Sequence, residues 1–191
     1  MKWLIVTSCY TDETVGGNVI YIERFINALI NNGHEVTLLA GTTKKDFVEY
    51  EQKDNLEIYR IFLPNGVTAL RYDAKKTLTQ KTKELLDNNQ YDCLNVHCGF
   101  ALNIDFIKAC RGKTKVIYTM HSLDFYENTF DLIKSIKTFT LKPMNLLKFP
   151  FKILANIYYE FNTFRYSHKT IVMSEFVKNY VLKFFGNREW K

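Results

Sequence analysis

Two glycines stand where this chain could hold a phosphate. Gly16 and Gly17 directly precede an amphipathic stretch that begins near Val19. The backbone N–H groups in the first turn of a helix lack partners within the helix and favour an anion, and glycine lets a phosphate approach the backbone closely. A turn that merely leads into the helix explains the pair equally well. The sequence matches neither G-x-G-x-x-G nor a loop followed by G-K-[ST], so two familiar nucleotide-binding fingerprints do not apply.

Two histidines each follow an apolar run. His121 closes Val-Ile-Tyr-Thr-Met, and His97 closes Leu-Asn-Val. A histidine at the end of a strand can orient a hydroxyl or act on a developing charge. The alternatives are a helix cap for His121 and a satisfied, half-buried side chain for His97. Asp124 and Glu127 follow closely and could pair with His121 or simply favour the start of a helix.

The pair Ser174–Glu175 follows the last short apolar run. Serine is a good N-cap, and an acidic residue in the first turn complements the helix dipole. We expect this structural role whether or not the pair also serves a ligand.

The elements that must position these residues alternate between strands and helices. Apolar runs predict strands, and 3.6-residue periodicity predicts helices. The pattern indicates a single α/β domain with a Rossmann-like, doubly wound and mainly parallel sheet, in which ligands bind beyond the carboxyl ends of the strands. We predict Gly33 as the cap of the first helix and Gly41 as the end of the second strand. The predicted strands cover 3–9, 35–40, 56–63, 91–98, 115–120 and 170–173, and the helices about 19–30, 74–89, 101–110 and 174–185.

The composition restricts the class of protein. A chain of 191 residues suits one domain. The four cysteines form no C-x-x-C pair and no zinc-finger pattern, so we expect reduced thiols, no metal and a cytoplasmic location. No apolar run reaches the roughly 18 residues that span a bilayer, and the N-terminus does not resemble a signal peptide.

The positive charge is concentrated in one segment. The net charge is +6, and residues 131–169 hold seven Lys and Arg against two acidic residues. Within the basic, aromatic segment 130–166, lysines alternate with apolar residues, which is typical of a segment lying on an anionic membrane. A helix docked on its own sheet with snorkelling lysines is the alternative; no nucleic-acid-binding module is apparent. The candidate membrane contacts are Lys142, Lys148, Phe149, Phe151 and Lys152.

Four stretches, in order, resemble retaining glycosyltransferase family 4, which has the GT-B fold of two Rossmann-like domains. The first runs from the opening strand through Gly16–Gly17 to Asn-Gly-His-Glu-Val-Thr-Leu-Leu-Ala. The others are Tyr-Asp-Cys-Leu-Asn-Val-His, Val-Ile-Tyr-Thr-Met-His-Ser and Lys-Thr-Ile-Val-Met-Ser-Glu-Phe-Val-Lys. The resemblance covers almost the whole chain and implies the N-terminal, acceptor-binding domain.

The resemblance also implies roles for the candidate residues. Gly16 and Gly17 would approach the diphosphate of a nucleotide-sugar substrate, and His121 would be the catalytic residue beside the transferred sugar. His97 and Asp124 would lie near the acceptor, a saccharide or a lipid-linked one. Ser174 and Glu175 would lie near the cleft between the domains. No cofactor is implied.

The resemblance stops before a second domain. The chain ends at Phe185-Gly-Asn-Arg-Glu-Trp-Lys, where the family continues into a domain that carries most of the nucleotide-sugar site. We therefore expect this chain alone to be inactive or weak. An excised domain, a truncated gene product and one half of a split enzyme, whose donor-binding domain is a separate domain or subunit, are the alternatives. Envelope polysaccharide or glycolipid synthesis, at the inner face of the plasma membrane, is the setting that the family implies. The alternative is a non-catalytic Rossmann-like module that binds a membrane or a partner.

Overall fold

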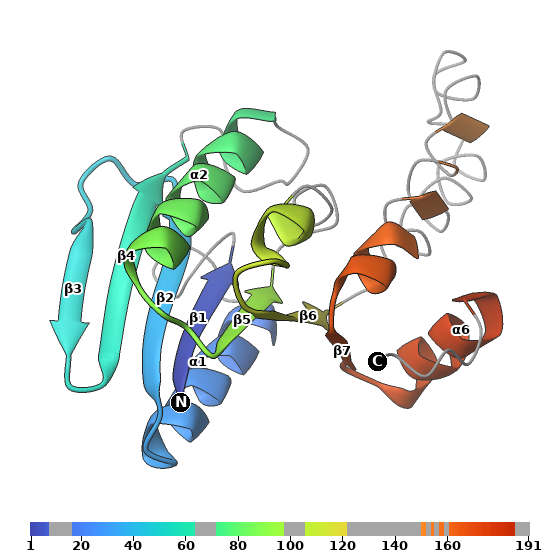
Figure 1. The fold of residues 1–191 in the computed structure, drawn as a ribbon, viewed down its shortest axis with the longest axis horizontal. Coiled ribbons are helices and arrows are strands. Elements are labelled where there is room, and N and C mark those ends of the chain that lie inside the picture. Colours follow the sequence, from blue (N-terminus) through green and yellow to red (C-terminus); the bar gives the residue numbers. More distant parts are fainter. Residues whose placement is uncertain are drawn as a thin grey trace.

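A seven-stranded sheet forms the centre of the molecule, with the order β3-β4-β2-β1-β5-β6-β7 (Figure 1). The computed structural model describes residues 1–7, 17–63, 72–97, 106–121, 150–151, 154, 157–158 and 161–185. Short helical stretches cover residues 106–110 and 161–166. The strands are β1 (Lys2–Thr7), β2 (Glu35–Thr42), β3 (Tyr50–Lys53), β4 (Leu56–Phe62), β5 (Cys93–His97), β6 (Lys115–Met120) and β7 (Lys169–Val172); the longer helices are α1 (Gly17–Asn31), α2 (Tyr72–Asn88) and α6 (Glu175–Phe185).

The strand order creates a switch point between β1 and β5. From β1 the chain first builds outward through β2 and β4, and it then returns to place β5 on the other side of β1. All neighbouring pairs are parallel except β3–β4, which is antiparallel. In sheets of this kind, the crevice at the switch point, beyond the carboxyl ends of the strands, is the usual ligand site.

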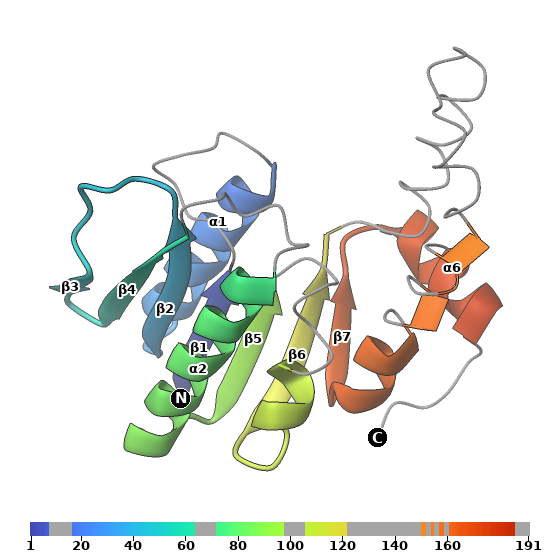
Figure 2. The same ribbon diagram turned by 90° about the horizontal axis from the view of Figure 1, so that it is seen from above.

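Helices cover both faces of the sheet (Figure 2). On one face, α1 packs its Ile22, Ile26 and Leu29 against apolar residues of β1, β2 and β4. On the other face, α2, α6 and the stretches 106–110 and 161–166 share one apolar cluster with alternate residues of β1, β5 and β6. Each fully buried Leu, Ile or Phe contributes about 1.5–3 kcal/mol by leaving water. The predicted doubly wound, mainly parallel sheet is therefore confirmed.

The structure confirms one of two predicted element ends and contradicts the other. Gly33 adopts a φ of 75° two residues after the end of α1 at Asn31, as predicted for its C-terminal cap. The prediction that Gly41 ends the second strand is wrong, because β2 continues through Gly41 and Thr42, which pair with Ile61 and Phe62. A neighbouring strand of matching length provides this pairing, and the local sequence does not reveal it.

Strand β3 was not predicted. Its sequence, Tyr-Glu-Gln-Lys, is polar, and all four residues are exposed. It forms because a turn at Asp54, with a φ of 50°, folds it back onto β4. It is an edge strand, so its side chains need not be apolar.

The end of the basic segment belongs to the core. In the stretch 161–166, Asn162, Thr163 and Phe164 are buried, and Phe164 packs edge-to-face on Tyr118 of β6. This part therefore follows the alternative of a helix docked on its own sheet. Among the described residues, no helix is long and apolar enough to cross a membrane.

Candidate functional site

His97 and His121 meet at the carboxyl edge of the sheet. His97 is the last residue of β5, and His121 directly follows β6, the neighbouring strand. Nδ1 of His97 lies 2.9 Å from Nε2 of His121, which is a hydrogen bond. The ring centroids are 5.2 Å apart. Two predicted site residues, 24 positions apart in sequence, thus form one unit.

Aromatic side chains of α1 cover this pair. The Tyr21 ring lies 5.8 Å from the His97 ring and stands edge-on to the His121 ring at 5.4 Å, while Phe25 lies 6.0 Å from His97. Burial, reinforced by the charge that His121 could carry, lowers the pKa of His97 to about 3. Burial also lowers the pKa of His121. His97 is therefore neutral at physiological pH, and the His121 pKa shift favours its neutral form too.

A second polar contact lies deeper in the same face of the sheet. Asn95 Nδ2 donates to Thr119 Oγ1 at 3.2 Å, and both side chains are fully buried. We did not predict Asn95 and Thr119 as part of the site. The signal was in the sequence: Leu-Asn-Val-His and Tyr-Thr-Met-His each alternate apolar and polar residues, which places the polar ones on one face of a strand.

The N-terminus of α1 is the second candidate feature. Gly17 is its first residue, and its first turn contains no acidic side chain that would repel an anion. A Cβ added to Gly17 would meet no atom of the described residues within 4 Å. Gly16 lies outside the described residues, as does Asp124.

Ser174 has the predicted capping role. Its Oγ accepts a hydrogen bond from the Val177 N–H at 3.2 Å, and Glu175, in the first turn of α6, pairs with Lys178 on the surface. These contacts are structural, and whether the pair borders a cleft stays a prediction.

Of the candidate membrane contacts, Phe151 is 75% exposed; Lys142, Lys148, Phe149 and Lys152 lie outside the described residues.

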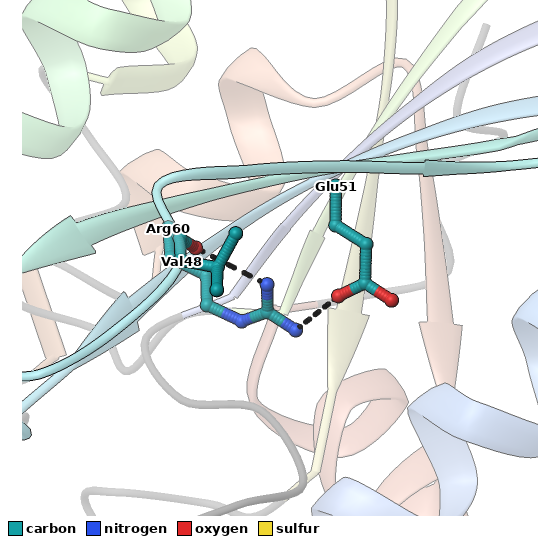
Figure 3. A network of polar contacts seen from close by, with 3 residues as sticks. All are labelled: Val48, Glu51 and Arg60. Carbon is teal, nitrogen blue, oxygen red and sulfur yellow. Dashed lines mark hydrogen bonds and ion pairs between the residues drawn. The ribbon is translucent and has the colours of Figure 1, made fainter.

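A pocket of about 240 Å³ opens at the carboxyl end of β2. Arg60 of β4 spans one wall, with its guanidinium donating to the Val48 carbonyl at 3.3 Å and to Glu51 at 3.1 Å (Figure 3). This network ties β3 to β4. Lys44, Asp46 and Phe47 also line the pocket, so its wall mixes both charges with an aromatic ring. Within the described part of the chain, no group of three or more His, Cys, Asp or Glu could hold a metal ion.

Known proteins resemble this chain in both sequence and fold. A family model described as "Glycosyltransferase Family 4" matches residues 15–191. The "Uncharacterized glycosyltransferase MJ1607" of Methanocaldococcus jannaschii is 31% identical over 100 residues, which are 51% of this chain and 25% of that protein. The matched stretch therefore spans only a quarter of that relative.

Two solved structures of sucrose-phosphate synthase from Thermosynechococcus elongatus share the fold. The first superposes with a TM-score of 0.69 at 12% identity, covering 98% of this chain and 46% of that one. The second gives a TM-score of 0.64 at 11% identity, with coverages of 97% and 83%. At such identities the likeness shows the fold alone. The family model, however, matches nearly the whole chain, and the chain belongs to glycosyltransferase family 4.

Proposed function

We propose that this chain is the N-terminal, acceptor-binding domain of a glycosyltransferase that moves a sugar from a nucleotide sugar with retention of configuration. One observation carries the proposal: the two candidate features flank the switch point of the sheet. The segment after β1 leads to the Gly17 end of α1, and the neighbouring β5 ends in His97, bonded to His121. A diphosphate and a reacting sugar would then lie side by side at one edge.

The proposed roles follow this placement. Gly16 and Gly17 approach the donor diphosphate, where backbone N–H groups stabilise the leaving charge. His121 is the catalytic residue beside the transferred sugar, and His97 and Asp124 lie on the acceptor side. Ser174 and Glu175 border the cleft. Catalysis in such a site consists mainly of positioning and electrostatic stabilisation.

The donor site needs a second half. This chain covers 46% of the sucrose-phosphate synthase structure that it superposes on. We propose that a second domain, in the same polypeptide or in a separate subunit, supplies most contacts to the nucleotide. Sugar transfer is then a property of the two parts together.

The replacement Gly17→Val tests this function. We expect kcat/KM for a nucleotide sugar to fall roughly tenfold or more, because the added side chain occupies the approach of the diphosphate. The free energy of unfolding should change by less than about 0.5 kcal/mol, because the side chain enters open space among the described residues. The assay uses the longest natural reading frame that contains this chain, with a panel of radiolabelled UDP- and GDP-sugars.

Gly112→Val is the matched control for Gly17→Val. Gly112 lies in the turn before β6, at the amino edge of the sheet, and a Cβ there also meets no described atom within 4 Å. We expect its donor use to stay within about twofold of wild type. Absence of transfer with every donor, or equal activity of the two variants, would contradict the proposal.

An exposed apolar helix face supports attachment to an anionic membrane as part of this function. The backbone is helical at residues 150, 151, 154, 157 and 158. Four large apolar side chains there are exposed: Phe151 by 75%, Leu154 by 64%, Tyr158 by 58% and Ile157 by 39%. Positions i, i+3 and i+7 share one face of a helix. The surrounding sequence supplies Lys142, Lys148 and Lys152. An apolar face next to lysines suits a bilayer with anionic lipid.

Co-sedimentation of the whole chain with vesicles measures this attachment. We expect binding to vesicles that contain phosphatidylserine, weaker binding at high salt, and none to neutral vesicles. The double replacement Phe151→Asp/Leu154→Asp should weaken binding about tenfold or more, because two apolar side chains no longer enter the bilayer. Val48→Asp is the control, since Val48 is 62% exposed but lies beside β3. Equal binding of wild type and the double variant would refute the attachment.

A further inference from the structure

The contact between the two histidines uses different nitrogen atoms of each ring. It joins Nδ1 of His97 to Nε2 of His121, and Nε2 lies at the tip of the imidazole ring. At 2.9 Å, one of these nitrogens carries the hydrogen and the other presents its lone pair. A neutral imidazole carries one hydrogen, so this bond couples the two rings: either both carry the hydrogen on Nδ1, or both carry it on Nε2.

We propose that His97 is a positioning residue that acts through His121. By binding Nε2 of His121, His97 holds that ring in one orientation and one tautomer, and it leaves Nδ1 as the His121 nitrogen available to a ligand. Only the use of Nδ1 by a ligand rests on the proposed function. The fixed ring and tautomer are properties of this chain alone.

His97 is the more firmly packed histidine of the pair. Its side chain is only 5% exposed, and its ring lies between the strand and the Tyr21 and Phe25 rings of α1. Its backbone is paired on the β1 side, where Thr7 is its register partner. His121 lies one residue beyond β6 and is less buried. The buried ring is therefore the anchor, and the other ring is presented at the edge.

The hydrogen bonding of His97 also indicates that it acts through His121. Its Nε2 has no hydrogen-bond partner among the described residues, so within that part of the chain its polar contact runs through Nδ1 to His121. The deeper Asn95–Thr119 contact joins the same two strands across the same sequence separation. It holds β5 and β6 together one step below the histidines and so keeps the two rings within reach.

Nitrogen-15 NMR on the whole labelled chain at pH 7.5 tests the proposal. Long-range ¹H–¹⁵N spectra distinguish the two neutral tautomers of each histidine. His168 provides an internal reference, because its Nδ1 accepts the Val116 N–H at 3.0 Å and the neutral ring must carry its hydrogen on Nε2. We expect His121 to show one tautomer in about tenfold or greater excess.

Two substitutions at position 97 separate positioning from packing. His97→Phe keeps a ring packed against Tyr21 and Phe25 but removes the hydrogen bond, so His121 should become a mixture of tautomers. His97→Asn places an amide near the position of Nδ1, which can bond to Nε2 of His121 and should shift its tautomers back toward those of wild type. Backbone amide spectra verify that both variants are folded. A tautomer mixture in wild type, or His97→Phe spectra of His121 equal to those of wild type or of His97→Asn, would overturn the proposal. None of these readouts depends on sugar transfer.

Discussion

Acidification from pH 7 to pH 5 is expected to lower the free energy of unfolding by about 2 kcal/mol through His97 alone. The folded protein holds the pKa of His97 at about 3, whereas a histidine in the unfolded chain has a pKa of about 6.5. Below pH 6.5 the unfolded state therefore binds a proton that the folded state rejects. Above this pH, the contribution of His97 to the free energy of unfolding is fully present. Below it, this contribution falls by up to about 1.4 kcal/mol per pH unit until the pH nears the pKa of the folded state.

The lowered pKa of His121 acts in the same direction. If both rings were protonated, two N–H groups would face each other across the short contact between them. This repulsion further lowers the free energy of unfolding at low pH. Urea unfolding at pH 5, 6 and 7 measures the loss. His97→Phe is the control, because it cannot take up the proton, and its stability should depend less on pH. Parallel profiles for wild type and His97→Phe would contradict the assignment.

Replacing Phe164 by alanine is expected to lower the free energy of unfolding by about 3–5 kcal/mol. The Phe164 side chain is 1% exposed and packs edge-to-face on Tyr118, with ring centroids 6.4 Å apart. It also belongs to the cluster that holds Val177 and Val181 of α6. Truncation leaves a cavity where the stretch 161–166 meets the sheet, and a rigid core fills such a cavity only in part.

Phe151→Ala provides the matched control for Phe164→Ala. Both positions remove the same side chain from the same basic, aromatic segment, but Phe151 is 75% exposed. We expect its free energy of unfolding to stay within about 0.5 kcal/mol of wild type. Thermal or urea unfolding of both variants gives the comparison. Similar losses would mean that the two phenylalanines are packed alike, contrary to the structure.

The contrast between these phenylalanines reflects a limit of sequence reasoning. The composition of segment 130–166 fits both a membrane contact and a helix docked on its own sheet. The structure assigns the docked role to 161–166, because Tyr118 and α6 provide an apolar surface there. The helical residues 151, 154, 157 and 158 keep large apolar side chains exposed. Their membrane role stays a prediction.

The sequence by itself determined most elements and their order, because apolar runs and helical periodicity are local signals. It also located the cap at Gly33, the N-cap at Ser174 and the carboxyl-edge positions of His97 and His121, since these depend on neighbouring residues. The missed strand β3 depends instead on pairing with β4.

Only the tertiary structure decided what the histidines do together. Their bond requires β5 and β6 to be parallel neighbours, with Val96 opposite Tyr118, so that two side chains 24 residues apart reach each other. It also requires α1 to cover that face with Tyr21 and Phe25, which excludes water and keeps His97 neutral. Distances and burial of this kind arise from contacts between distant segments, and no local pattern of residues contains them.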